Sequence, residues 1–359
     1  MKLFVQKMAV LGLLLVLAIS GLNYLGIKAG KVYKDGAALV CETKRDMVRS
    51  GSIHYETGKT NVLFMGTSRI LAGINPIAFD EYSGGNTFSY NLALPALPIS
   101  AAYFVLRDYL AKNPPPQVIV MQLYINRCRT CTLVNYYSSQ GMTRLDEMLS
   151  LFANSPGKGI VVNYVFPFRM YKFFTVQYLF NGMLHPARLQ EAREFNKTIL
   201  DGMKKERGYY FIQEQALSQD NRLPAGGFGE DGNESNETPK LEKNTEYDPF
   251  LDPYVEKFFN LTEEKDIHVL LIQPVYRENQ CMQYEQIPLQ FQVLLARYRH
   301  VATAAQGWKV KLYENSFFAD PTHLNREGAL RFTREIYNEF HEVFGEKEIR
   351  AGMEIIHEH

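Results

Sequence analysis

The sequence predicts an α/β protein with a single domain, in which a parallel sheet is flanked by helices, interrupted by a large insertion and preceded by a transmembrane helix. Short apolar runs typical of buried strands alternate with segments whose apolar residues recur at helical spacing, a pattern typical of parallel sheets. A charge-free run close to the N-terminus predicts the transmembrane helix. The chain has 359 residues, of which 46% are hydrophobic, so it is long enough to bury a sizeable core.

The charge balance excludes several classes of protein. Lys and Arg number 39, Asp and Glu also number 39, and the formal net charge is +0. Nucleic-acid binding needs a basic excess for phosphate contacts, so we expect no nucleic-acid partner. Charged residues make up 22% of the chain, an ordinary globular share that argues against a disordered chain and against many membrane spans. We expect neither a cofactor nor a bound metal.

Residues 1–30 are predicted to anchor the chain in a membrane. The run Met8–Ile27 has 20 residues without a charge, and as a helix it would be about 30 Å long, enough to cross a bilayer. Two alternatives are a cleaved signal peptide, with a small-residue site at Ala18–Ser20, and a buried helix of a soluble protein. Lysines lie on both sides of the run, so the positive-inside rule does not decide its orientation. No second long apolar stretch follows, which predicts a single crossing.

The predicted domain follows a linker, residues 31–59, that has a helical pattern from Asp35 to Arg49. Its strands are short apolar runs bounded by turn residues, predicted at 61–65, 88–93, 118–124, 267–273 and 308–313. Its helices have apolar residues at helical spacing, predicted at 99–111, 286–303 and 326–344. The domain thus spans residues 60–345, and a charged tail, residues 346–359, follows it.

Residues 135–252 break the alternation of strands and helices, and we interpret them as an insertion into the domain. The stretch has aromatic-rich pieces, an amphipathic segment at 187–205 and a Gly-rich acidic run at 225–237. Its aromatic residues either form a core or line a sugar-binding groove, where flat rings stack on pyranose faces. Burial in a core is the commoner role.

The four cysteines are even in number, which is compatible with an oxidising compartment. Cys128 and Cys131 form a Cys-x-x-Cys pair, whereas Cys41 and Cys281 stand alone. The pair fits a short disulfide, half of a zinc site, or two reduced cysteines. Without a second Cys-x-x-Cys, a four-ligand zinc site has little support, and the disulfide state stays open.

Residues that can carry chemistry follow the predicted strands at their carboxyl ends, where open parallel sheets bind ligands. Ser68 follows the first strand and Asn126 follows the third. Asp320 and His323 share one loop before the last helix, where a carboxylate can orient the imidazole. A serine hydroxyl is a weak nucleophile and needs such a base. Each residue alone fits a plain turn or a helix cap, but together they predict a Ser–His–Asp triad.

The same residues resemble the four sequence blocks of the SGNH (GDSL-type) hydrolase superfamily. The resembling blocks are Val62–Arg69, Asn91–Pro95, Val118–Asn126 and Asp320–Asn325, of which the last fits best. Thr67 stands where the best-known members have Asp, and Tyr124 stands where the third block has Gly. The resemblance implies that Ser68, Asp320 and His323 are catalytic and that Ala93, in place of a glycine, and Asn126 bind the oxyanion.

A single N-terminal span together with these blocks is similar to one branch of the superfamily. That branch holds membrane-anchored proteins that work with a membrane-bound O-acyltransferase in alginate or cellulose O-acetylation or in D-alanylation of teichoic acids. The resemblance implies a single-pass protein of the inner or plasma membrane, with a periplasmic or extracellular catalytic domain and such an acyltransferase as its partner.

The function implied is that of a serine acyltransferase or esterase that moves an acyl group, expected to be acetyl, on a cell-surface glycan. Whether the acceptor is a sugar hydroxyl or water stays open. The alternative is a non-catalytic adaptor that binds polysaccharide or a membrane acyltransferase, with Ser68 as a mere turn residue. A Ser68 hydroxyl within hydrogen-bond reach of His323 would favour catalysis.

Overall fold

The computed structural model of the chain describes residues 2–28, 36–95, 97, 99–122, 184–210, 253–278, 295–304 and 311–345. The chain divides into two compact units, one of Met1–Glu42 and Cys128–Leu200, the other of Thr43–Arg127 and Asp201–His359. Every strand of the described residues, and the predicted triad with them, belongs to the second unit.

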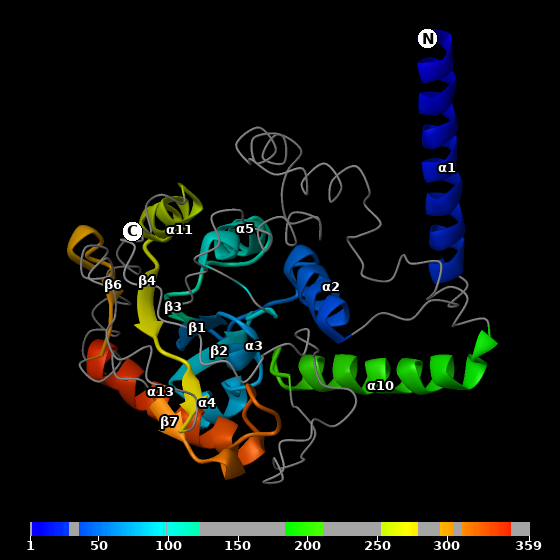
Figure 1. The fold of residues 1–359 in the computed structure, drawn as a ribbon. Coiled ribbons are helices and arrows are strands. Elements are labelled where there is room, and N and C mark those ends of the chain that lie inside the picture. Colours follow the sequence, from blue (N-terminus) through cyan, green and yellow to red (C-terminus); the bar gives the residue numbers. More distant parts are fainter. Residues whose placement is uncertain are drawn as a thin grey trace. The chain divides into compact units, whose positions relative to one another are not determined.

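The second unit is built on a five-stranded sheet with the strand order β2-β1-β3-β4-β6 (Figure 1). Its strands are β1 (Thr60–Met65), β2 (Thr87–Asn91), β3 (Val118–Gln122), β4 (His268–Ile272) and β6 (Val301–Ala302). All neighbouring pairs are parallel. The carboxyl ends of the strands therefore meet at one edge of the sheet.

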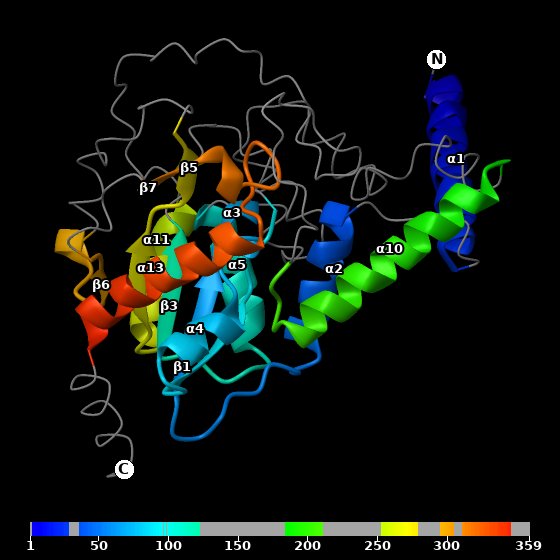
Figure 2. The ribbon, with the colours of Figure 1, turned by 90° about the horizontal axis from the view of Figure 1, so that it is seen from below.

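Helices cover both faces of the sheet (Figures 1 and 2). One face carries α5 (Ile99–Leu110) and α11 (Pro253–Glu264), which pack against each other, and the other carries α4 (Pro76–Tyr82) and α13 (Arg326–Phe344). Strands covered on both faces read as continuous apolar runs, and all of β3 is buried accordingly. Between sheet and helix, the rings of Phe64 and Phe79 meet edge-on with centroids 4.9 Å apart.

The last helix, α13, shows how the local sequence sets an element. The side chain of Asn325 caps its first turn by accepting a hydrogen bond from the amide of Gly328 at 2.9 Å. Apolar residues at helical spacing, among them Phe332, Ile336 and Phe340, are buried along one face. The predicted bounds, 326–344, are confirmed.

Several smaller elements complete the described residues. They are α2 (Gly36–Arg49), α3 (Ser68–Leu71), α10 (Pro186–Lys205), the 3-10 helix η4 (Asn315–Phe317), and β5 (Val275–Arg277) with β7 (Lys311–Tyr313), which pair in a two-stranded parallel sheet. The helix predicted in the linker corresponds to α2, and the amphipathic segment of the insertion corresponds to α10.

One prediction about the C-terminal part was wrong, and another was confirmed in its described part. The stretch predicted as a helix at 286–303 contains β6, whose two residues pair with β4. A strand of two residues is too short to show a pattern of its own and is specified by the neighbour with which it pairs. The strand predicted at 308–313 corresponds in its described part to β7, which pairs with β5 and not with the main sheet.

The N-terminal helix α1 (Lys2–Lys28) belongs to the first unit and contains the run predicted to cross a membrane. Among the helices of the described residues, none is long and apolar enough to cross a membrane.

Candidate active site

The strand order reverses between β1 and β3, where open parallel sheets bind their ligands. After β1 the chain adds β2 on one side, and it later places β3 on the other side. The turn that follows β1 carries Ser68, so the predicted nucleophile lies at this switch point.

Thr67 and Gln122 connect the two strands at the switch point. Gln122 is the last residue of β3, and its Oε1 accepts hydrogen bonds from the amide of Thr67 at 2.9 Å and from the hydroxyl of Thr67 at 2.8 Å. Gly66 leaves space for this approach, because its φ is +152° and a Cβ there would lie 2.6 Å from Cβ of Gln122. The contact fixes the turn that carries Ser68.

Ser68 is the first residue of the one-turn helix α3, which is capped by the hydroxyl of Thr67. It is half-buried. Within the described residues, no hydrogen bond joins Ser68 Oγ to His323. Catalytic hydrogen bonds are often long in enzymes without substrate and shorten when substrate binds, so Ser68 stays a candidate nucleophile.

Asp320 and His323 are in direct contact, as the Asp-x-x-His spacing predicts. His323 Nδ1 lies 2.7 Å from Asp320 Oδ2, and the amide of His323 donates to Asp320 Oδ1 at 2.8 Å. Thr322 adds its amide at 2.8 Å and its hydroxyl at 3.1 Å, both to Asp320 Oδ1. The loop therefore surrounds the buried carboxylate with donors and holds it in one orientation.

The surroundings of Asp320 keep its carboxyl group ionised and decide which nitrogen of His323 carries the proton. Burial raises the pKa of Asp320, but the hydrogen bond and charge of His323 and the two amide donors outweigh burial, so the pKa lies below its ordinary value of 3.8. Asp320 is thus a carboxylate at neutral pH, and His323 Nδ1 carries the proton of their shared bond. Nε2 is then the basic nitrogen, which is the tautomer that a general base requires.

Arg69 connects the turn of Ser68 to the loop of Asp320 and His323. Its Nη1 donates to the carbonyl of Thr322 at 3.3 Å and to the carbonyl of Val275 at 3.0 Å. Arg69 and Thr322 are 253 residues apart in the sequence. The fold therefore brings the three predicted catalytic residues to the same edge of the sheet.

The backbone around Ala93 is engaged in other bonds. Its amide donates to Asn91 Oδ1 at 3.0 Å, and its carbonyl accepts a hydrogen bond from the buried Lys44 Nζ at 2.6 Å. The side-chain amide of Asn91 in turn donates to the carbonyls of Ile70 and Ile74, each at 2.9 Å. Ala93 could serve as an oxyanion donor only by giving up its bond to Asn91.

Tyr210, which the sequence placed in the insertion, also lies at this edge. Its amide donates to the carbonyl of Leu71 in α3 at 3.1 Å, and its side chain is buried. Burial and the negative charge of Asp320 raise the pKa of Tyr210 to about 12, so it is a neutral phenol. Sequence reasoning missed it because no motif marks it.

Arg69, Gln122 and Thr322 were also missed, although each has a signal in the sequence. Arg69 is a charged residue directly after the candidate nucleophile, Gln122 is a polar residue inside an apolar strand, and Thr322 lies within the Asp-x-x-His motif. Asn126 and the cysteines Cys128, Cys131 and Cys281 lie outside the described residues, so their predicted roles stay predictions.

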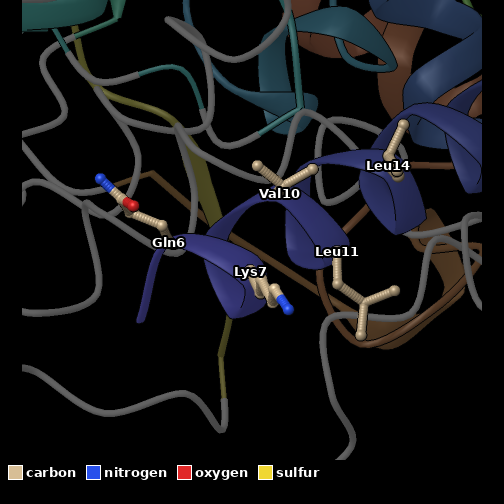
Figure 3. A pocket seen from close by; sticks show the side chains of 5 residues that line it. All are labelled: Gln6, Lys7, Val10, Leu11 and Leu14. Carbon is tan, nitrogen blue, oxygen red and sulfur yellow. The ribbon is translucent and has the colours of Figure 1, made fainter. Parts of the chain in front are cut away.

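Within the described residues, no group of three or more His, Cys, Asp or Glu side chains could hold a metal ion. A pocket lies on α1 and is lined by Gln6, Lys7, Val10, Leu11 and Leu14 (Figure 3). Its lining has no serine, cysteine, histidine or carboxylate, so we assign it no chemistry.

Fold and site together define a class of protein: a parallel α/β protein with the strand order β2-β1-β3-β4-β6, the order of flavodoxin-like sheets, and an acid–histidine pair at the carboxyl edge of its main sheet. The chain belongs to the DUF1574 family of proteins of unknown function, and the match covers residues 8–339. No curated protein matches the sequence.

Proposed function

We propose that this protein is a serine acyltransferase or esterase of the SGNH (GDSL-type) kind, which moves an acyl group, in our proposal acetyl, on a cell-surface glycan. The observation that carries the proposal is the 2.7 Å contact between His323 Nδ1 and Asp320 Oδ2, in a loop that Arg69 ties to the turn of Ser68. A buried carboxylate that orients an imidazole is the arrangement that activates a serine hydroxyl.

In the proposed reaction, Ser68 Oγ attacks the carbonyl carbon of an acyl ester while its proton passes to His323 Nε2. Asp320 stabilises the imidazolium that forms. The tetrahedral intermediate collapses, the bond to the donor alcohol breaks, and His323 returns the proton to that alcohol, which leaves an ester on Ser68. A sugar hydroxyl or water then attacks this ester by the same route, and the acceptor decides between transferase and esterase.

The oxyanion of the intermediate would be held by the Ser68 amide and, as the resemblance implies, by Asn126. The Ala93 amide donates to Asn91 Oδ1, so we leave Ala93 out of the proposed oxyanion hole. Removal of one such donor typically costs about 10²–10³ in rate. A site that lacks the Ala93 donor would therefore be slow and still active.

We place the protein, as part of the proposal, in the inner or plasma membrane, with its site on the periplasmic or extracellular side and a membrane-bound O-acyltransferase as its acyl-supplying partner. The support is the charge-free run Met8–Ile27 and the resemblance described above. Alkaline extraction of membranes tests the location. The intact chain should stay in the pellet, and its recovery in the soluble fraction would contradict this placement.

Turnover of an activated acetyl ester tests the catalytic proposal. The Ser68→Ala variant should fold normally and lose turnover, because a half-buried turn serine contributes little packing. Mass spectrometry of the wild-type protein should find an acetyl group on Ser68. Ser52→Ala, which changes an exposed serine, is the matched control and should keep full activity. Full activity of Ser68→Ala would end the catalytic proposal.

A non-catalytic adaptor is the second candidate function. One observation favours it: the Ala93 amide, which an oxyanion hole would use, is engaged by Asn91. Sedimentation with purified polysaccharide tests the adaptor. Binding that Ser68→Ala leaves unchanged, in a protein without ester turnover, would support it over the enzyme.

A further inference from the structure

The two residues on either side of Ser68 are both held by bonds to distant parts of the sheet edge. On one side, Thr67 bonds to Gln122 at the end of β3. On the other side, Arg69 bonds to the carbonyls of Val275 and Thr322. Both neighbours of Ser68 are therefore held by hydrogen bonds to other segments of the chain. A turn that only connects two elements would not need these bonds.

The guanidinium of Arg69 connects the turn of Ser68 to β5 and to the loop of Asp320 and His323. Its Nη1 reaches Val275, 206 residues away, and Thr322, 253 residues away. Its Cζ lies 4.7 Å from the ring centroid of Tyr276, so the planar group also stacks on β5. Arginine suits this position because it is always charged and its donors have a fixed planar geometry.

The carbonyl of Thr322 is the contact that matters for the site. Thr322 directly precedes His323, and its amide and hydroxyl bind Asp320 Oδ1. A displacement of the Thr322 carbonyl would therefore move the carboxylate and the imidazole together. Hydrogen bonds from a charged donor are about twice as strong as neutral ones, so Arg69 is well suited to prevent this displacement.

We propose that Arg69 is a positioning residue that holds the Asp320–His323 loop in register with Ser68, so that the proton can pass between Ser68 Oγ and His323. The proposal rests on the proposed function of the site. Arg69 acts through the Thr322 carbonyl, and we assign it no contact with the reacting atoms. Its loss should therefore slow the chemical step more than it weakens substrate binding.

Kinetics of Arg69→Ala on an activated acetyl ester test the proposal. A misplacement of about 1 Å can cost about 10²-fold in rate, so kcat should fall by about 10- to 100-fold while KM changes little. Arg69→Lys keeps a charged donor and should recover part of the loss, and added guanidinium ion should partly restore Arg69→Ala. Arg334→Ala is the matched control, because Arg334 stacks at 4.9 Å on Tyr82, is exposed and should leave kcat unchanged.

A second readout does not depend on turnover. The proton on His323 Nδ1, in its 2.7 Å contact with Asp320, should give a strongly downfield proton resonance in the wild-type protein. Arg69→Ala should broaden or shift this resonance because the loop is less constrained, and Arg334→Ala should not. If Arg69→Ala fails to fold, as judged by circular dichroism, Arg69→Lys and Arg69→Gln replace it in both measurements.

The outcomes separate this proposal from the proposed function. Wild-type turnover that Ser68→Ala abolishes and Arg69→Ala leaves intact would overturn the positioning role and keep the enzyme. A wild-type protein without turnover would end the proposed function, and the His323 resonance then decides alone. If the His323 resonance is unchanged in the Arg69 variants, the proposal is overturned. If the resonance is lost in those variants and kept in Arg334→Ala, the result supports the positioning role of Arg69.

Discussion

The amide and the hydroxyl of Thr67 both donate to a single acceptor, Oε1 of Gln122, at 2.9 and 2.8 Å. Both side chains are buried. The contact links the end of β3 to the turn after β1, and Gly66 is the residue whose missing side chain permits it. The geometry of the candidate nucleophile thus depends on a strand far from it in the sequence.

Gln122→Ala should lower both stability and activity. Two buried donors of Thr67 would lose their acceptor, which typically costs about 1–3 kcal/mol for each unsatisfied group. Urea unfolding measures the stability, and ester turnover measures the effect on the site. Gln117→Ala is the matched control, because Gln117 makes a similar bridge to the amide of Asn61, at 2.6 Å, at the opposite end of the same strands. Loss of activity in both variants to the same extent would contradict a specific role for Gln122.

His323→Ala and Ser68→Ala should not have additive effects. If the two residues act as one catalytic unit, each single variant removes the whole covalent route, and the double variant is hardly slower than either. Asp320→Asn should lose less, because it removes charge and orientation while His323 stays. The measurement is kcat/KM for all four variants on one activated ester. If the loss of kcat/KM in the double variant equals the product of the two single losses, Ser68 and His323 act independently.

The stability of the wild type relative to Asp320→Asn should depend on pH in the acid range. The pKa of Asp320 is lowered below 3.8 in the folded protein, so the carboxylate contributes stability that is fully present above that value. This contribution is lost as the pH falls through the lowered pKa. Urea unfolding of both proteins across the acid range should therefore show a difference that shrinks below pH 3.8.

Asp80→Asn provides the opposite case within the same protein. Burial raises the pKa of Asp80, and its bonds to Thr87 and Ser89 and the charge of Arg207 offset only part of that effect. Protonation of Asp80 is therefore easier in the folded protein than in the unfolded chain, and the wild type should lose stability relative to Asp80→Asn as the pH rises above 3.8 through the raised pKa. Parallel slopes for the two variants would contradict these assignments.

Gly208→Ala should destabilise the protein. Gly208 has a φ of +88°, and a Cβ there would lie 2.1 Å from the carbonyl oxygen of Asn91, the last residue of β2. Strain and collision together should cost more than about 1 kcal/mol in the free energy of unfolding. Gly202→Ala is the control, because Gly202 lies within α10 and its added Cβ would meet no atom within 4 Å apart from its chain neighbours and the backbone of its own helix. That variant should gain up to about 1 kcal/mol, and equal effects would contradict the predicted contact.

The long apolar elements were predictable from the sequence because their patterns are local. The strand ending at Met65, the strand beginning at Val118 and the helix capped by Asn325 each have enough residues to show their period. The two residues of β6 do not, and the pattern of β7 does not show that it pairs with β5. Short strands at an edge take their form from tertiary contacts.

The candidate site was predictable to the extent that its residues follow strand ends. Ser68 and the pair of Asp320 and His323 are placed by that rule, and the contact within the pair follows from their spacing. The bond from Arg69 to the Thr322 carbonyl does not, because it depends on how two segments 253 residues apart approach each other. The same holds for the approach of Tyr210 to Leu71.

The contacts of α3 with Gln122 and Tyr210 have a consequence for how this family can vary in length. Gln122, the last residue of β3, binds Thr67, and the amide of Tyr210 binds the carbonyl of Leu71, at the other end of the same one-turn helix. The two ends of the intervening stretch thus converge on a single turn. Lengthening a closed loop costs only about 0.6 kcal/mol per doubling, so relatives can gain or lose many residues between these points while the sheet and the candidate triad stay the same.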